Sequence, residues 1–192
     1  MEQEQTLTPQ DSLALIRDVI NKTTDNINHH SFVFMLWGWL IAGASLLRYA
    51  VEVVSGADHF FYPLPAAGVI GVVTTLFYYK RMQRTVPETY LNYFIKKLWL
   101  VLGIGFVCVV LVSVFQNIPP FTYTLIVAGI GTLATGLVMR FRPVQVGGAI
   151  FLLASVVCAL VPDVDKALVH GIAIVAGYLV PGYLLKHAKP RL

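Results

Sequence analysis

The sequence predicts an all-α fold, a polytopic membrane helix bundle with six transmembrane helices behind an N-terminal amphipathic cytoplasmic helix. Hydrophobic residues make up 57% of the chain and charged residues only 12%, and the mean hydropathy is +0.71. That charge density is about half of what a soluble domain carries. The apolar residues gather in stretches long enough to cross a hydrocarbon core about 30 Å thick. Backbone in lipid must satisfy its own hydrogen bonds, so these stretches are expected to be helices.

Residues 1–30 form the predicted cytoplasmic helix. Thr8 suits its N-cap and Pro9 its first position, and apolar residues then recur at helical spacing. Residues 1–28 carry five acids against two bases, whereas helices that bind anionic lipid are usually basic. We therefore expect this acidic helix to pack beneath the basic inner face of the same chain or against a cytoplasmic protein partner.

The first three spans occupy the N-terminal half of the transmembrane domain, which covers residues 31–192. The first span is expected at residues 32–54, and a short polar loop connects it to the second at residues 60–79. Pro87 is expected to open the third helix, because proline suits the first turn of a helix. The apolar part of that helix covers residues 98–115.

The last three spans follow with connections equally short. The fourth, residues 122–139, ends at a basic turn, and the fifth covers residues 144–161. An acidic loop precedes the sixth, residues 167–185, which holds the helix-breaking pair Pro181 and Gly182 near its inner end. Because every connection is short, we expect no extramembrane catalytic domain.

Small or helix-kinking residues recur at every fourth position in the second, fourth and sixth spans. Such stripes let helix backbones approach closely. They are explained either by three stacked hairpins that form a pseudo-repeat or by the general frequency of Gly and Ala in membrane helices. The stripes are Ala67, Gly71 and Thr75; Ala128, Thr132 and Gly136; Ala173, Gly177 and Pro181.

Basic residues predict the orientation. Twelve of the 14 Lys and Arg residues fall in the segments on one side of the spans, and only Arg48 and Lys166 fall elsewhere. By the positive-inside rule, both termini are then cytoplasmic, and the protein belongs to the bacterial inner (cytoplasmic) membrane. Apart from the acidic helix, the inner segments carry ten bases against Glu88 alone. This positive charge is explained by the orientation of the spans, so it is not taken as a sign of nucleic-acid binding.

Arg48 is the most unusual residue, because it lies about 9 Å of helix rise inside the outer end of its span. An ionisable residue within a membrane is a candidate for ligand binding. Glu52 lies one turn further on, where it can pair with Arg48. The structural alternative is an arginine that snorkels to the outer interface and is held there by Glu52.

His170 completes the candidate ligand-binding residues, since it follows the last outer loop. A divalent metal would be a candidate ligand if His170 converged with the outer acids and His59. The spacing of these residues matches no known metal motif, however, so charged loop residues in contact with water are the simpler interpretation. We predict no metal site. The outer residues in question are Asp58, His59, Asp163, Asp165 and His170.

Several segments resemble one known group of proteins along essentially the whole chain. The group consists of uncharacterised six-span integral membrane proteins of Bacteroidota with no assigned activity. The resemblance implies the same topology and a signalling or regulatory setting, and it transfers no catalytic residue. The segments are residues 12–23 (SLALIRDVINKT), 36–39 (LWGW), 136–143 (GLVMRFRP) and 179–185 (LVPGYLL).

The function class expected from these observations is a non-enzymatic sensing, regulatory or protein-interaction module. No carboxylate lies in the centre of a span, and no Walker, HExxH or zinc motif occurs, so we expect neither an enzyme nor a cofactor. Cys108 and Cys158 lie at different depths and are expected to stay unpaired. The alternatives are a small-solute transporter or channel that uses Arg48, and a homo-oligomeric structural protein.

Overall fold

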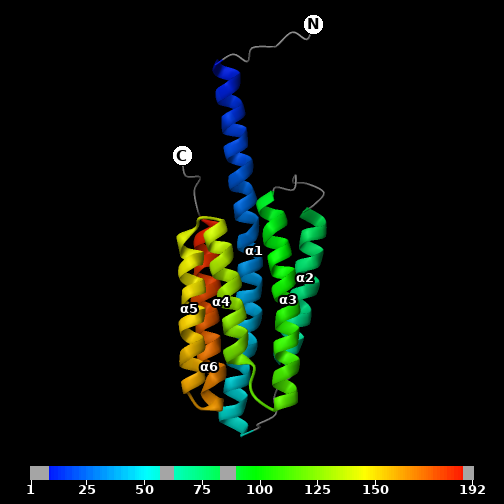
Figure 1. Ribbon diagram of the computed structural model, residues 1–192, viewed down its shortest axis with the longest axis vertical. Helices are drawn as coiled ribbons and strands as arrows, with labels where there is room; N and C mark the ends of the chain where they lie inside the picture. The colour runs from blue at the N-terminus through cyan, green and yellow to red at the C-terminus, as the bar shows by residue number, and fades with distance from the viewer. Residues whose placement is uncertain (1–8, 57–62, 83–89, 188–192) are drawn as a thin grey trace.

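Helices make up all regular structure in the part of the chain that the computed structural model describes, which is residues 9–56, 63–82 and 90–187, with side chains from residue 31 onward. The helices run up and down beside one another, and the described chain ends lie at the same end of the bundle (Figure 1). They are α1 (Pro9–Ser55), α2 (Pro63–Met82), α3 (Tyr90–Gln116), α4 (Phe121–Val138), α5 (Arg142–Leu160), α6 (Asp163–Ile174), the π-helix η1 (Val175–Leu179) and α7 (Val180–Lys186).

Helix α1 joins the expected cytoplasmic helix and the expected first span in one element of 47 residues. At 1.5 Å per residue it is about 70 Å long, more than twice the thickness of a hydrocarbon core. Its N-terminal part extends beyond the ends of the other helices instead of folding beneath them (Figure 1). The expected packing of this acidic segment against the chain's own basic face or against a partner stays a prediction, because its side chains lie outside the described part of the structure.

Five of the helical segments in the described residues are long and apolar enough to cross a membrane. They agree with the expected first, third, fourth, fifth and sixth spans to within two residues or contain them. Helix α2, which corresponds to the expected second span, has 20 residues but is not one of these five segments. The expected start of that span lies outside the described residues, as does Pro87. The five segments are Ser31–Ser55, Tyr90–Gln116, Phe121–Val138, Arg142–Leu160 and Asp163–Lys186.

Left-handed residues end α3 and α4 and produce the tight turns between spans. Asn117 has a φ of 54° and Arg140 a φ of 51°. The N–H group that follows each of them donates to a carbonyl oxygen five residues earlier. Ile118 donates to Ser113 and Phe141 donates to Gly136, each with an N–O distance of 3.0 Å. This is the pattern of a Schellman motif, which satisfies the last carbonyl groups of a helix. The chain can therefore reverse at each end of α4 within a few residues.

Helices α4 and α5 have the most extensive contact of the described helix pairs, and they meet through glycines. A Cβ added at Gly148 would overlap the backbone nitrogen of Leu133, and one added at Gly136 would lie 2.5 Å from the nitrogen of Gln145. Larger side chains would separate the two backbones, which is why small residues favour helix association in lipid. The small-residue stripe of the fourth span therefore faces a neighbouring helix.

Helices α2 and α3 attach to the rest of the bundle through tryptophan. The indole Nε1 of Trp37 on α1 donates to Thr75 Oγ1 on α2, at a distance of 3.1 Å. The indole Nε1 of Trp99 on α3 donates to Thr135 Oγ1 on α4, also at 3.1 Å. Gly71 leaves room for the Trp37 ring, because a Cβ there would lie 3.0 Å from it. Most of the exposed side chains of α2 and α3 are apolar, as expected for surfaces that face lipid.

The last span contains a π-helical turn instead of a break at Pro181 and Gly182. Proline has no N–H, so Gly177 does not receive the usual hydrogen bond from the residue four positions later. The N–H of Val180 bonds to Val175, five residues back, which is the π-helical pattern. The helix therefore continues past Pro181 with its backbone shifted locally, and it reaches Lys186.

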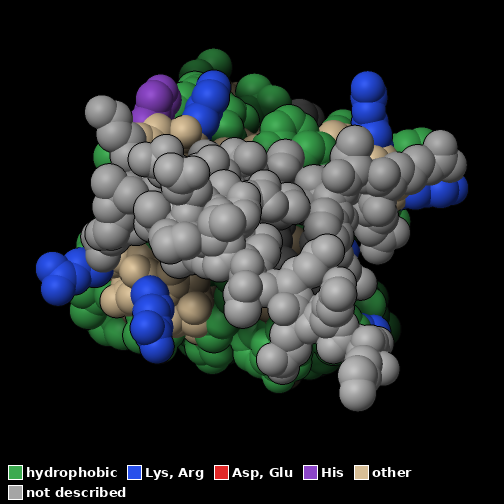
Figure 2. Space-filling view, turned by 90° about the horizontal axis from the view of Figure 1, so that it is seen from above, with side chains coloured by type: hydrophobic (Ala, Val, Ile, Leu, Met, Phe, Trp, Pro, Cys, Tyr) green, Lys and Arg blue, Asp and Glu red, His purple; other side chains and the backbone are tan. Residues whose placement is uncertain are grey.

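Charged side chains separate between the two ends of the bundle. Figure 2 shows the end that holds the described termini, with Lys and Arg side chains along its margin and no Asp or Glu among the coloured side chains in view. At the other end, Arg48 and Lys166 accompany Glu52, Asp163 and Asp165. The basic end includes Lys80, Arg81, Lys96, Lys97, Arg140, Arg142 and Lys186.

Candidate functional site

Arg48 lies inside the bundle and not at its lipid-facing surface. Its exposed fraction is 4%, and its Nε donates a hydrogen bond to Glu52 Oε2 over 3.4 Å. The expected pair is therefore present, because residues four apart share a face of α1. The guanidinium is buried among neighbouring helices and is held by Glu52, one turn nearer the outer end, so the alternative of an arginine directed to the outer interface stays open.

Phe121 provides the second contact for the guanidinium. This residue is the first of α4, is 1% exposed, and has its ring centroid 5.1 Å from Arg48 Cζ. A cation over an aromatic face is attracted by the ring quadrupole, more strongly where water is excluded. The ring thus stabilises the buried charge from the side of α4, while Glu52 stabilises it from α1.

His170 on α6 lies against the same phenyl ring, at 5.1 Å between ring centroids. Its Nδ1 is 2.9 Å from Ser45 Oγ and its Nε2 is 3.4 Å from Thr124 Oγ1. Ser45 lies on α1, three residues before Arg48, and Thr124 lies on α4. Both ring nitrogens of the buried imidazole therefore have hydroxyl partners on two other helices.

The hydrogen bonds of Thr124 determine which nitrogen of His170 carries the proton. Its Oγ1 lies 3.0 Å from the carbonyl oxygen of Pro120 and 2.9 Å from that of Phe121, so its only hydroxyl proton is donated to the backbone. Toward His170, Thr124 can then act only as an acceptor. The geometry fits a neutral imidazole with its proton on Nε2, whose Nδ1 accepts the hydroxyl of Ser45.

These residues form one buried group that joins α1, α4 and α6, and we call it the outer polar cluster. The three residues proposed from the sequence, Arg48, Glu52 and His170, all belong to it. Sequence reasoning missed Phe121 and Thr124, and it left a constellation of Ser45 with His170 open without support from their spacing. Ser45 alone carried a signal, because it is three positions from Arg48 and so shares its face of the helix. The cluster consists of Ser45, Arg48, Glu52, Phe121, Thr124 and His170.

The outer acids do not join His170. Asp163 forms an ion pair of 2.6 Å with Lys166, and its side chain is 67% exposed. Within the described part of the chain, no three His, Cys, Asp or Glu side chains lie close enough to bind a metal ion. Asp58 and His59 lie outside that part. Both cysteines are free, with Cys108 exposed on α3 and Cys158 buried in α5.

The outer polar cluster can hold charge and can change its hydrogen bonding, and it places a hydroxyl group within hydrogen-bond distance of a neutral imidazole. The Ser45 hydroxyl approaches His170, but the imidazole has no carboxylate partner among its described contacts. No protein-family model matches the chain, and no curated protein and no solved structure matches it at a significant level. Function must therefore be inferred from the residues and their geometry.

Proposed function

We propose that this protein is a six-span protein of the bacterial inner membrane, with both termini in the cytoplasm, that acts as a non-enzymatic sensing or interaction module. Its α1 would carry a signal between the membrane and a cytoplasmic protein partner. The observation that carries this proposal is the continuity of α1, which joins the outer polar cluster to the part that extends beyond the bundle (Figure 1).

The parity of the helices supports the proposed topology. An odd number of crossings would place the two chain ends on opposite sides, but the described ends lie toward the same end of the bundle (Figure 1). Helix α2 supplies the sixth crossing in this proposal, and its last turn carries Lys80 and Arg81. The basic end is then cytoplasmic by the positive-inside rule. The resemblance to the six-span proteins of Bacteroidota favours the same topology.

The acidic composition of residues 1–28 supports a protein partner instead of a lipid surface. Those residues carry five acids and two bases, and an anionic membrane surface would repel them. A rigid helix that extends from a span also transmits rotation or displacement of that span. A partner with a basic surface would therefore experience changes that begin in the bundle.

Deletion of residues 2–28 tests this function in the full membrane-inserted protein. Cross-linking followed by affinity purification should recover a defined partner with the wild type and lose it with the deletion. A second variant, Asn28→Pro, keeps the acidic segment but breaks α1 ahead of the bundle. It should still bind the partner, but changes in the first span should no longer reach that partner. An unchanged set of partners for the deletion would reject the proposal.

A second candidate function is transport of a small anionic solute, favoured by the burial of Arg48 within a span. Flux into liposomes should then occur with the wild type and fall with Arg48→Ala. Absence of flux for all tested anions, with an intact fold, would exclude this candidate.

A further inference from the structure

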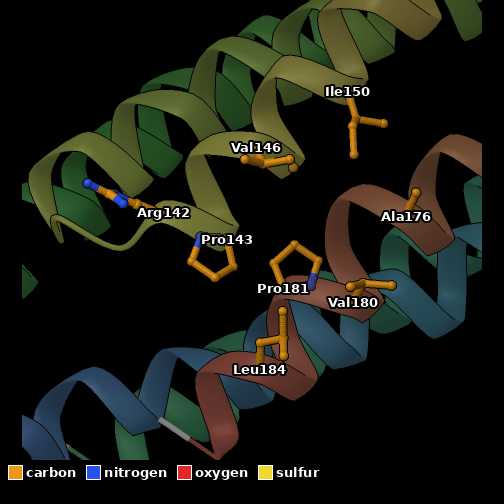
Figure 3. A pocket seen from close by; sticks show the side chains of 9 residues that line it. Arg142, Pro143, Val146, Ile150, Ala176, Val180, Pro181 and Leu184 are labelled. Atoms are coloured by element: carbon orange, nitrogen blue, oxygen red, sulfur yellow. The ribbon is translucent and has the colours of Figure 1, made fainter.

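An apolar groove of about 310 Å³ lies between α5 and the last span, away from the outer polar cluster. Figure 3 shows Val146 and Ile150 on one wall, and Ala176, Val180 and Leu184 on the other. Val146, Val180 and Leu184 are exposed, so the groove opens on the surface of the bundle. A hydrocarbon chain of matching width therefore has access from the bilayer.

The groove exists because α5 and η1 touch at their glycines. A Cβ added at Gly147 would lie 2.5 Å from the carbonyl oxygen of Gly177 and 2.9 Å from Pro181 Cγ. The two backbones are therefore in contact at the floor, and the branched side chains on either side form the walls. Figure 3 also shows the rings of Pro143 and Pro181 facing each other across the gap.

Arg142 marks one end of the groove. In Figure 3 its side chain extends away from the apolar walls, along the direction of the basic end. It is exposed, and the described side chains at that end include bases such as Arg140 and Lys186 but no acid. An anionic group bound beside Arg142 would therefore be attracted by these bases, and no acidic side chain among the described residues at that end would repel it.

We propose that this groove binds an anionic phospholipid of the inner leaflet. One acyl chain would occupy the apolar part, and the phosphate would pair with Arg142. Residues 142–150 span about 12 Å of helix, which fits within a single leaflet, whose hydrocarbon layer is about 15 Å deep. Basic pockets between helices on the cytoplasmic side recognise anionic headgroups by the same combination.

The proposal requires the membrane placement proposed above but not the protein partner. Loss of partner recovery on deletion of residues 2–28 concerns the projecting end of α1, whereas the groove is formed by α5, η1 and α7. The two proposals therefore fail separately.

Native mass spectrometry of the delipidated full chain, titrated with phosphatidylglycerol or phosphatidylcholine of the same acyl chains, tests the site. The wild type should bind phosphatidylglycerol more tightly. Arg142→Gln should weaken phosphatidylglycerol binding about fivefold, which corresponds to one basic residue near a membrane surface, and it should weaken phosphatidylcholine binding less, because the choline group offsets the charge of that lipid's phosphate. Arg81→Gln, which removes an exposed base at the same end but on α2, serves as the matched control and should bind as the wild type does.

Filling the groove supplies the second arm of the test. Val146→Trp should weaken binding of both lipids, and Leu184→Trp does the same from the opposite wall if the first variant does not fold. Equal effects of Arg142→Gln and Arg81→Gln would overturn the headgroup assignment. Undiminished lipid binding by both tryptophan variants would overturn the groove as the lipid site. A dimer that both variants dissociate would overturn it too, and would assign the groove to a second copy of the chain.

Discussion

At the scale of single residues, the outer polar cluster explains how a cation is kept inside an apolar bundle. The charge of Arg48 is balanced by Glu52 on the same helix and by the face of Phe121. Removal of one partner from a buried pair leaves an uncompensated charge, which costs more than the pair itself contributes. The cluster is therefore sensitive to single substitutions and tolerant of paired ones.

Arg48→Ala should destabilise the protein by about 3 kcal/mol, because it leaves the carboxylate of Glu52 without its partner in a mostly buried position. Unfolding in detergent measures this loss. The matched control is Lys166→Ala, which breaks the pair with the largely exposed Asp163 and should cost less than about 1 kcal/mol. Replacement of both Arg48 and Glu52 by leucine should recover part of the stability, and equal losses for Arg48→Ala and Lys166→Ala would contradict this account.

His170 should be a neutral imidazole with its proton on Nε2, because Thr124 donates its own proton to the backbone and Ser45 is left to donate to Nδ1. The ring ¹⁵N shifts in a long-range ¹⁵N–¹H spectrum distinguish this tautomer from the other. Ser45→Ala should move the Nδ1 resonance and cost about 1 kcal/mol, since a buried acceptor loses its donor. A proton found on Nδ1 of the wild type would refute the proposed arrangement.

At the scale of helices, packing depends on a few positions where backbones meet. Helices α4 and α5 approach through Gly136 and Gly148, and α5 approaches η1 through Gly147. Without a hydrophobic driving force in lipid, van der Waals contact between close backbones supplies much of the association. A single methyl group at such a position must therefore have a large effect.

Gly148→Ala should destabilise the bundle by about 2 kcal/mol, because its Cβ would overlap the backbone of Leu133, which cannot rotate away. The matched control is Gly105→Ala in α3, where an added Cβ meets nothing within 4 Å. That change should be neutral or slightly stabilising, since alanine is the better helix former. Unfolding in the same detergent compares the two, and similar losses for both would show that α4–α5 contact is not the cause.

The bounds of the spans were predictable from the sequence, whereas the contacts between them were not. Hydropathy is a local property, so the bounds expected for the span at residues 144–161 lie within two residues of those of α5. Contact between Ser45 and His170 joins positions 125 residues apart and depends on how two helices are rotated. Lipid-facing and partner-facing sides are both apolar in a membrane helix, so periodicity carries little information about rotation. The same limit hid Phe121 and the groove beside Gly147.

At the scale of the whole molecule, charge separation and helix parity agree on one topology. The basic end would face the cytoplasm, and the end with Glu52, Asp163 and Asp165 would face outward. The part of α1 ahead of the bundle then lies in the cytoplasm, where a protein partner is accessible. Helix α2 is the decisive element, because the proposed even number of spans requires it to cross the membrane.

Single cysteines placed in a variant without Cys108 and Cys158 should reveal this topology. With a membrane-impermeant maleimide on cells whose outer membrane is permeable, Ser55→Cys and Asp165→Cys should be labelled, because both precede or follow spans at the outer end. Arg81→Cys and Lys186→Cys should be labelled only after the inner membrane is opened, since they end α2 and α7 at the basic end. Labelling of Arg81→Cys in intact cells would show that α2 does not cross, and the termini would then lie on opposite sides.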